Sequence, residues 1–260
     1  MKLLKLRIDI NCDLGESYGH FEVGQGADIM PHITSANVAC GFHAGDPRTM
    51  ALTVKLAKRF GVAVGAHPGF PDLRGFGRRE MQLKPEETRS DVLFQIGALQ
   101  AFATASHIRL QHVKPHGALY NMAARDAGLS EIVLEAVKCV DPELIVFAPS
   151  KSIMAKVASK MGFRVALEAF ADRAYNADGK LVSRNKPEAV IKNPKLVVER
   201  VVEMVRKGTV LAINGETLDL GEVHTICIHG DTPDSAQLAK ALKSKLLAAK
   251  INVKPVGSFL

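Results

Sequence analysis

The sequence predicts an α/β protein that folds as a (β/α) barrel of seven parallel strands. Seven short hydrophobic runs recur along the chain, amphipathic stretches separate them, and the runs end in clusters of His, Asp, Glu or Lys. Titratable side chains at the carboxyl ends of parallel strands are how such a barrel builds a catalytic mouth from distant parts of its chain. We therefore expect an enzyme, with runs that finish at residues 9–13, 37–40, 64–67, 112–116, 146–149, 167–168 and 226–231.

The stretches between the runs carry helix-start signals. In three of them a proline beside an acidic or oxygen-bearing residue precedes the amphipathic segment, an arrangement preferred in the first turn of a helix. Strand, loop and helix thus alternate, which indicates a parallel sheet with helical crossovers. The three helices predicted from these signals cover residues 50–60, 92–105 and 236–249.

Two regions depart from this alternation. Residues 210–214 also resemble a strand, but only about ten residues separate them from the last run. A parallel crossover needs about a dozen residues or more, so we expect residues 210–220 to form a hairpin or a short antiparallel excursion, and we count seven barrel strands.

Residues 169–193 show no clear helix or strand, and their length, charge and aromatic content predict a lid over the mouth.

Composition limits the class of protein. A chain of 260 residues with 47% hydrophobic and 23% charged residues can bury a sizeable core, and we expect one domain over residues 1–260. The longest apolar stretches have only strand length, so we expect no membrane segment and a cytoplasmic protein. The cysteines show no CxxC spacing and are expected to pack as reduced thiols: Cys12, Cys40, Cys139 and Cys227.

The charge is basic but dispersed. The net charge is +7, from 34 basic and 27 acidic residues, and the chain contains no Trp. Nucleic-acid binding would require a concentrated basic stripe with stacking aromatic side chains, so we do not expect it. An anionic substrate remains compatible with this charge.

Strand alternation separates the core side chains from those of the site, because successive residues face opposite sides of a strand. A satisfied hydrogen-bond network deep in the barrel explains Asp9, Asn11 and His112 better than catalysis does, since an unpaired buried charge is costly. The faces expected to point inward hold Asp9, Asn11 and Asp13 in the first strand, Leu110, His112, Lys114 and His116 in the fourth, and Cys227, His229 and Asp231 in the last.

The best catalytic candidates lie near the strand exits. They are Asp13, His67, His116 and His229, joined by His43, which lies in a loop aimed at the mouth. The neighbouring Asp46 has two competing interpretations of equal weight: it is a plausible N-cap of the following helix and also a plausible substrate contact.

A bound metal remains open from the sequence. The set Asp13, His43 and His116 has the residue types of a His and carboxylate metal site. Lys114, between His112 and His116, argues against a tight dication because its ammonium group would repel the ion, and it fits better as a partner for a substrate anion.

Several nucleotide and hydrolase signatures are absent. The chain has no GxxxxGK[ST] loop, no GxGxxG after the first strand, no HExxH and no GxSxG. Direct nucleotide binding, zincin chemistry and a serine nucleophile therefore lose support.

Motifs in register along almost the whole chain resemble the LamB/YcsF family. They are residues 11–17 (NCDLGES), 35–46 (SANVACGFHAGD), 65–72 (GAHPGFPD) with 75–79 (GFGRR), 112–121 (HVKPHGALYN), 170–175 (FADRAY) and 229–231 (HGD). The resemblance implies a distorted, seven-stranded, TIM-barrel-like fold related to glycoside hydrolase and deacetylase folds. It also implies an ATP-dependent 5-oxoprolinase activity, in which the lactam of 5-oxo-L-proline opens to L-glutamate.

The resemblance further implies that companion B and C subunits use the ATP and activate the substrate by phosphorylation. The missing nucleotide loop agrees with that division of labour. Whether the chain also self-associates stays open.

A lactam of this kind needs an activated carbonyl, an activated water and a proton for the departing nitrogen. We expect Asp13 or His116 to act as the general base and His43 or His67 to protonate nitrogen. Lys114 with Arg79 or Arg173 would hold the substrate carboxylate and phosphate, and Asp72 and Asp172 would orient these cations. The full set of expected substrate-binding residues is Asp46, Asp72, Arg79, Lys114, Asp172, Arg173, His229 and Asp231.

Two rival functions remain. One is a metal-dependent amide or carbohydrate deacetylase that needs no ATP and uses Asp13, His43 and His116 as ligands. The other is a protein that only captures a small carboxylate and passes it on, its His and Asp side chains serving recognition.

Overall fold

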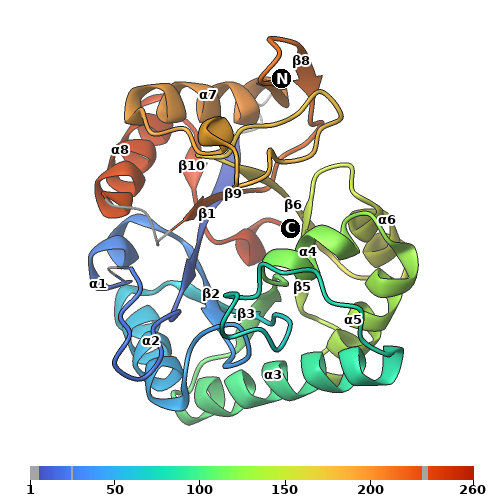
Figure 1. The fold of residues 1–260 in the computed structure, drawn as a ribbon. Coiled ribbons are helices and arrows are strands. Elements are labelled where there is room, and N and C mark those ends of the chain that lie inside the picture. Colours follow the sequence, from blue (N-terminus) through green and yellow to red (C-terminus); the bar gives the residue numbers. More distant parts are fainter. Residues whose placement is uncertain (1–5, 25, 230–233) are drawn as a thin grey trace.

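The computed structural model describes residues 6–24, 26–229 and 234–260, and within them the predicted barrel is present. Seven parallel strands follow one another around a ring, and the last pairs with the first, which closes the barrel (Figure 1). These strands are β1 (Arg7–Leu14), β2 (Ser35–Ala39), β3 (Ala63–His67), β4 (Leu110–Val113), β5 (Ile145–Pro149), β6 (Val165–Phe170) and β9 (Thr225–His229).

The predicted hairpin is also confirmed. Strands β7 (Thr209–Leu211) and β8 (Thr217–Asp219) pair antiparallel and stand outside the ring, so the count of seven barrel strands is correct. The long segment after β6 contains only the short 3-10 turn η2 (Pro187–Ala189) and isolated bridges, as expected for a loop.

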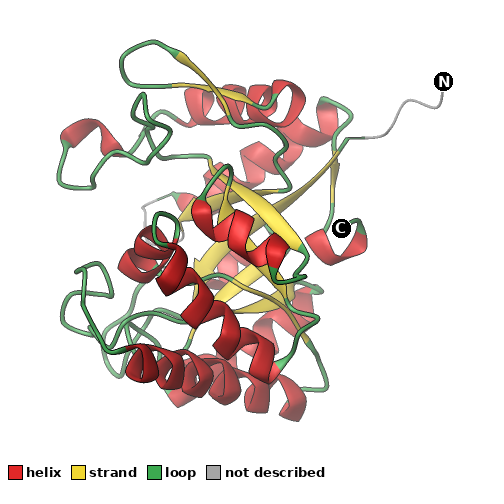
Figure 2. Ribbon diagram, turned by 90° about the vertical axis from the view of Figure 1, so that its right-hand side faces the viewer, coloured by secondary structure: helices red, strands yellow, loops and turns green. Residues whose placement is uncertain are grey.

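Helices surround the strands and cover the outer face of the barrel (Figures 1 and 2). None of the described helices combines the length and apolar character needed to cross a bilayer. The longer helices are α2 (Pro47–Phe60), α3 (Pro85–Ala105), α5 (Ala127–Val140), α6 (Ile153–Lys160), α7 (Pro194–Lys207) and α8 (Ser235–Ala248). The shorter ones are α1 (Gly26–Ile29), η1 (Met30–His32) and α4 (Gly117–Ala123).

The helix-start signals account for the residues at which the observed helices begin. The Asp46 side chain accepts a hydrogen bond of 2.8 Å from Thr49 N at the start of α2, and Pro85 opens α3 as the proline signal predicts. Helix α8 begins at Ser235, one residue before the predicted segment, and the Thr232-Pro233 signal lies outside the described residues.

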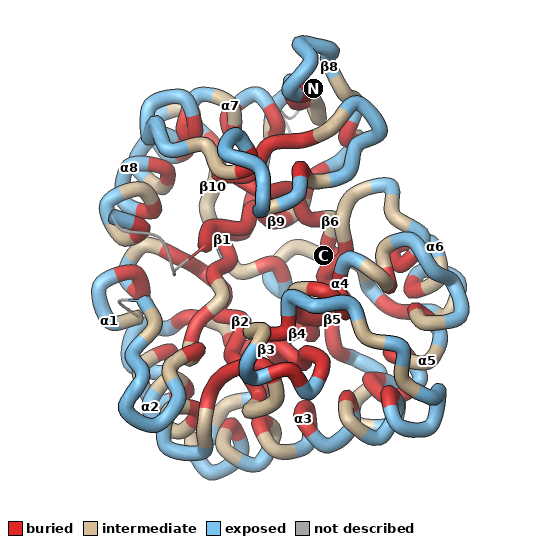
Figure 3. The backbone as a smooth tube through the Cα atoms, in the orientation of Figure 1, coloured by how far each residue is buried: buried red, intermediate tan, exposed pale blue. Residues whose placement is uncertain are grey.

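Buried residues concentrate between the strands and the helices, and exposed ones lie on the outer helix faces (Figure 3). On β1, Ile8, Ile10 and Cys12 face this outer layer and are fully buried. Cys12, Cys40 and Cys227 are buried and Cys139 is exposed, and these four cysteines form no disulfide with one another, as expected.

Strand β4 breaks the predicted alternation. Its register against β3 shifts between Val64 and Gly65, so that Leu110 pairs with Val64 and His112 pairs with Gly65. Leu110 joins the hydrophobic core instead of sharing the polar face with His112. A one-residue irregularity of this kind re-aims side chains and cannot be read from period-2 patterning.

The C-terminal segment closes the amino-terminal end of the barrel. Short strand β10 (Asn252–Val253) pairs with the start of β1, and the 3-10 turn η3 (Val256–Ser258) follows it. Val256 packs on Ile145, Phe147 and Ala166, and Gly257 N donates to Gln111 Oε1 at 3.1 Å. In Figure 1 the C-terminus accordingly lies within the ring of strands.

Candidate active site

A cavity of about 930 Å³ opens at the carboxyl ends of the barrel strands. Its volume suits a small-molecule site. Side chains from the strand ends meet those of the long loop after β6, which lines the cavity from Arg173 to Asn185. Of the predicted site residues, those that line the cavity are Asp13, His67, Lys114, His116, Arg173 and His229.

The polar groups below the cavity form the satisfied network expected for Asp9, Asn11 and His112. Asn11 Nδ2 donates to Glu168 Oε1 at 2.9 Å, and His112 Nε2 lies 2.7 Å from Asn37 Oδ1. Asp9 accepts hydrogen bonds from the hydroxyl groups of Thr34, Ser35 and Thr225. Burial, only partly offset by these bonds, raises the pKa of Asp9 to about 6.

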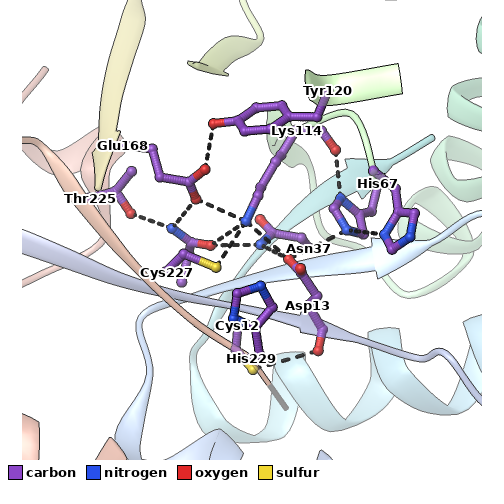
Figure 4. A network of polar contacts seen from close by, with 12 residues as sticks. Cys12, Asp13, Asn37, His67, Lys114, Tyr120, Glu168, Thr225, Cys227 and His229 are labelled. Atoms are coloured by element: carbon purple, nitrogen blue, oxygen red, sulfur yellow. Dashed lines mark hydrogen bonds and ion pairs between the residues drawn. The ribbon is translucent and has the colours of Figure 1, made fainter. Parts of the chain in front are cut away.

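Lys114 is the centre of the site (Figure 4). Its Nζ lies 3.1 Å from Asp13 Oδ1, 2.9 Å from Glu168 Oε1 and 3.1 Å from Cys227 Sγ, and the side chain is only 3% exposed. Burial alone would lower the pKa of Lys114, but the carboxylates of Asp13 and Glu168 outweigh it and raise the pKa well above its usual range. Lys114 is therefore a permanent cation held between two carboxylates.

Asp13 is correspondingly a permanent anion. Its Oδ1 accepts from Asn37 Nδ2 at 2.8 Å and lies 3.4 Å from His67 Nε2. Burial would raise the pKa of Asp13, but the positive charges of His67 and Lys114 hold it well below its usual range.

Tyr120 closes the opposite side of this network. Its hydroxyl donates to Glu168 Oε2 at 2.5 Å, and burial together with the Glu168 carboxylate raises the pKa of Tyr120 well above its usual range. The phenol thus stays protonated and keeps donating to Glu168, while Lys114 neutralises the other oxygen of the same carboxylate.

Three histidines gather beside Asp13. The rings of His43 and His116 stack with centroids 3.7 Å apart, and His67 meets both rings edge-on. Burial and the neighbouring imidazoles lower the pKa of His43 and of His116 well below the usual range, so both are neutral. His43 itself is fully buried behind His116 and does not line the cavity.

The structure regroups the metal ligands proposed from the sequence. Donor atoms of Glu16, His43, His67 and His116 lie within 4.8 Å of one another, and those of Asp13, Cys227 and His229 form a second group. The expected set of Asp13, His43 and His116 is therefore split, with Glu16 taking the place of Asp13.

The loop after β6 is fixed by its own buried groups. Arg173 donates to the backbone oxygens of Val182 at 2.6 Å and Ala189 at 3.2 Å, so this guanidinium braces the loop while one side lines the cavity. Asp172 lies 3.0 Å from His229 Nδ1 and orients that imidazole. We had expected it to orient a substrate-binding cation such as Arg173. Burial would raise the pKa of Asp172, but His229 keeps it below the usual range.

Besides Asp172, which contacts His229, three predicted substrate contacts do not line the cavity. The carboxylate of Asp46 caps α2 and accepts from Gly19 N at 2.8 Å. Asp72 and Arg79 do form the predicted ion pair, but it ties their own loop together and leaves the Arg79 side chain 64% exposed. Among the described residues, Arg78 lines the cavity where Arg79 was expected. Asp231 lies outside the described residues.

Four residues that the sequence left without a predicted role are brought into the site by the fold: Glu16, Asn37, Tyr120 and Glu168. The sequence did place each of these four residues in a hydrophobic run or a motif stretch that leads to the site. Glu168 ends the sixth hydrophobic run, and the others stand inside the stretches 11–17, 35–46 and 112–121. What was missing was the direction in which each side chain points.

Comparison with known proteins places this geometry in a family. Residues 8–260 match the LamB/YcsF family. The chain belongs to that family. Two family relatives, from Thermococcus onnurineus and Pyrococcus furiosus, are named as A subunits of 5-oxoprolinase. They are 53% and 51% identical to this chain, and each alignment covers 98% of this chain and all of the relative.

Solved structures agree with the family assignment. The lactam utilization protein from Thermus thermophilus superposes with a TM-score of 0.90 at 46% identity, covering 96% of this chain and 99% of that one. A protein from Enterococcus faecalis that is only 14% identical superposes with a TM-score of 0.57 over 98% of both chains, which shows a shared fold alone.

Proposed function

We propose that this chain opens the lactam ring of 5-oxo-L-proline to give L-glutamate, as the A component of an ATP-dependent 5-oxoprolinase. The observation that carries the proposal is the full-length match, at about half identity, to relatives named as A subunits of 5-oxoprolinase. The structure supports it because polar residues from most of the motif stretches line one cavity at the barrel mouth. We expect the complex to work in the cytoplasm, where ATP is supplied.

The division of labour follows from the chemistry of a lactam. A five-membered lactam is a stable amide, and phosphorylation of its carbonyl oxygen makes the carbon a better electrophile. We assign that step, and the ATP, to partner B and C subunits. This chain then supplies a cavity at the barrel mouth, an anionic base for the water that opens the ring and a proton carrier for the departing nitrogen. Ring opening gives γ-glutamyl phosphate, and a second water releases phosphate from it to give glutamate.

Asp13 is the proposed general base. It lies at the floor of the cavity, and Lys114 and Asn37 fix its orientation. Lys114 keeps Asp13 ionised and offers a fixed positive charge where negative charge develops on the substrate. Tyr120 binds one oxygen of Glu168 and so fixes this carboxylate. The other oxygen of Glu168 binds the Lys114 ammonium group and holds it in place.

His229 is the proposed proton carrier, in place of His43 or His67. It lines the cavity, and Asp172 binds its Nδ1 at 3.0 Å, which orients the ring. An imidazole oriented by a buried carboxylate is a recurrent device for proton transfer.

Cations at the rim provide for a carboxylate and a phosphate. Arg78 and Arg184 both line the cavity, Arg78 over the ring of Phe76 at 4.9 Å. We assign substrate-anion binding to this pair, with Lys114 below, in place of Arg79 and Arg173, whose guanidinium groups bind Asp72 and backbone oxygens.

The decisive experiment reconstitutes the chain with B and C subunits from the same genome and measures glutamate formed from 5-oxoproline and ATP. The Asp13→Asn variant should lower the rate by about 10²- to 10⁴-fold, the usual contribution of a positioned base. Asp28→Asn, on the exposed surface, is the matched control and should keep the wild-type rate. Circular dichroism would verify that both variants fold.

The outcomes separate the rival functions. Wild-type rates in Asp13→Asn would remove Asp13 from the mechanism. Failure of the wild-type complex to form glutamate would refute the proposed reaction. Release of acetate from an N-acetylated sugar without ATP would instead support the deacetylase alternative.

A further inference from the structure

Four consecutive strands deliver one potential metal ligand each to the same wall of the cavity. Glu16 follows β1, His43 follows β2, His67 ends β3 and His116 follows β4. One donor atom from each side chain lies within 4.8 Å of the other three, and all four side chains are buried. Residues this far apart in sequence converge only because the barrel closes around them.

Backbone carbonyl groups fix the protonation of two of the rings. His67 Nδ1 lies 2.6 Å from Lys114 O, and His116 Nε2 lies 2.8 Å from Phe76 O. A carbonyl oxygen can only accept, so each of these nitrogens carries the hydrogen. The nitrogens left to bind a cation are therefore His67 Nε2 and His116 Nδ1. Such carbonyl contacts are the usual outer support of a metal-binding histidine.

These two lone-pair nitrogens face each other at 3.0 Å. Two acceptors at that distance repel unless a cation lies between or beside them. The contact therefore requires either a second proton on one of the rings or a metal ion shared by both.

His43 adds an independent observation. Its side chain is fully buried, and neither ring nitrogen has a hydrogen-bond partner among the described residues. Leaving a buried polar nitrogen unbonded costs about 1–3 kcal/mol. Its Nε2 points toward the same cluster and lies 3.6 Å from Glu16 Oε1, a separation longer than a hydrogen bond.

We propose that Glu16, His43, His67 and His116 bind one divalent first-row transition-metal ion, with zinc the best match to the donor set. Tetrahedral zinc at about 2.0–2.1 Å from its ligands spaces them about 3.4 Å apart. Three of the six pairwise separations lie near that value: 3.0 Å between His67 Nε2 and His116 Nδ1, and 3.6 Å from Glu16 Oε1 to each of His43 Nε2 and His116 Nδ1. The rings of His43 and His116 stack in parallel at 3.7 Å, so one of them must rotate for both lone pairs to reach the same ion. Three imidazoles and a carboxylate are ligands that zinc and its neighbours accept.

Two glycines leave the room that this cluster occupies. A Cβ atom at Gly69 would lie 2.7 Å from His43 Nδ1, and one at Gly77 would lie 2.6 Å from His43 Cβ and 2.8 Å from the His116 ring. Gly69 has no left-handed backbone that would itself require glycine, so the requirement there is space. Any larger residue at either position would displace His43 from the cluster.

Lys114 lies next to the site, and its ammonium group binds Asp13 and Glu168. Asp13 Oδ1 lies 3.1 Å from Lys114 Nζ and 3.4 Å from His67 Nε2, so a carboxylate stands between the ammonium group and the cluster and offsets the repulsion that a dication would meet. Glu16, His67 and His116 line the cavity, so a bound ion would be reachable by a substrate oxygen. Metal binding at these residues can be measured without the lactam reaction.

The test measures metal binding directly. The full chain, purified without a metal-affinity step, is analysed for first-row metals by plasma mass spectrometry. It is then stripped with a chelator and titrated with Zn²⁺ and with Co²⁺, whose visible spectrum reports coordination. We expect about one ion per chain and a Co²⁺ spectrum with nitrogen and oxygen ligands. Zn²⁺ should also raise the melting temperature.

Variants distinguish a site from adventitious binding. His116→Gln and Glu16→Gln should each weaken Zn²⁺ affinity by about tenfold or more. His112→Gln, another buried histidine of the same segment but bonded to Asn37, is the matched control and should keep wild-type affinity. If wild-type protein binds no stoichiometric Zn²⁺ or Co²⁺, or if the variants bind as tightly as the control, the metal site is refuted and a proton bridges His67 and His116.

Discussion

Replacing Lys114 with methionine should destabilise the protein severely. The ammonium group lies about 3 Å from both Asp13 and Glu168, inside the barrel. At an effective dielectric constant of about 20, each contact is worth roughly 5 kcal/mol of Coulomb energy, much of it offset by desolvation. Removing one partner of a buried ion pair costs about 3–5 kcal/mol because the remaining charges are left uncompensated. We expect a loss of that size in the free energy of unfolding at pH 8.

The loss should shrink as the pH falls. In the Lys114→Met variant the two carboxylates face each other without a cation, so their folded-state pKa values rise above those of the unfolded chain. Such a group is more stabilising when protonated, and the variant should therefore recover part of its stability between about pH 7 and pH 5. The double variant Lys114→Met/Glu168→Gln should recover part of it at pH 8 as well.

Urea denaturation followed by circular dichroism would measure both effects. The control is Lys207→Met, which removes the exposed ion pair of Lys207 with Glu203 and should cost about 0.5 kcal/mol or less. Equal losses for Lys114→Met and Lys207→Met would contradict the reasoning, as would a Lys114→Met deficit that does not depend on pH.

Three further predictions concern the barrel itself. Gly65→Ala should cost about 1–3 kcal/mol or more, because the new Cβ would lie 2.1 Å from the His112 ring, and His112→Ala should partly rescue it in urea melts. Asp9 has a raised pKa of about 6 in the folded chain, so its contribution to stability is lost as the pH rises from about 4 to 6; pH-dependent melts of Asp9→Asn should lack that change, which amounts to about 3 kcal/mol. Asp46→Ala should cost about 1 kcal/mol through the lost cap of α2 and leave lactam turnover near wild type, whereas a large drop in turnover would restore the substrate role expected from the sequence.

The barrel could be predicted because its signals are local. Each strand is a hydrophobic run, each crossover has room for a helix, and the spacing before Thr225 is too short for one, which gives the hairpin of β7 and β8. The shift in β4 could not be predicted, because it depends on how Val64 and Gly65 pair with a distant strand. Leu110 was misplaced for that reason.

The candidate site was predictable at the level of segments and less so at the level of side chains. Strand ends and motifs lead to the cavity, so Asp13, His67 and Lys114 are where the sequence places them. Loop residues are different, because a turn decides their direction. Gly77, at φ +63°, lies in the turn just before Arg78 and Arg79, and of these two neighbours Arg78 lines the cavity while Arg79 bonds Asp72.

The 3-10 turn η3 closes the amino-terminal end of the barrel, so the cavity opens at one end. Val256 packs against the starts of β5 and β6 at the closed end, so substrate and product enter and leave at the strand carboxyl ends. Glutamate must therefore leave through the same opening before the next substrate molecule can enter. If partner subunits activate the lactam, as we propose, they must deliver it at this rim.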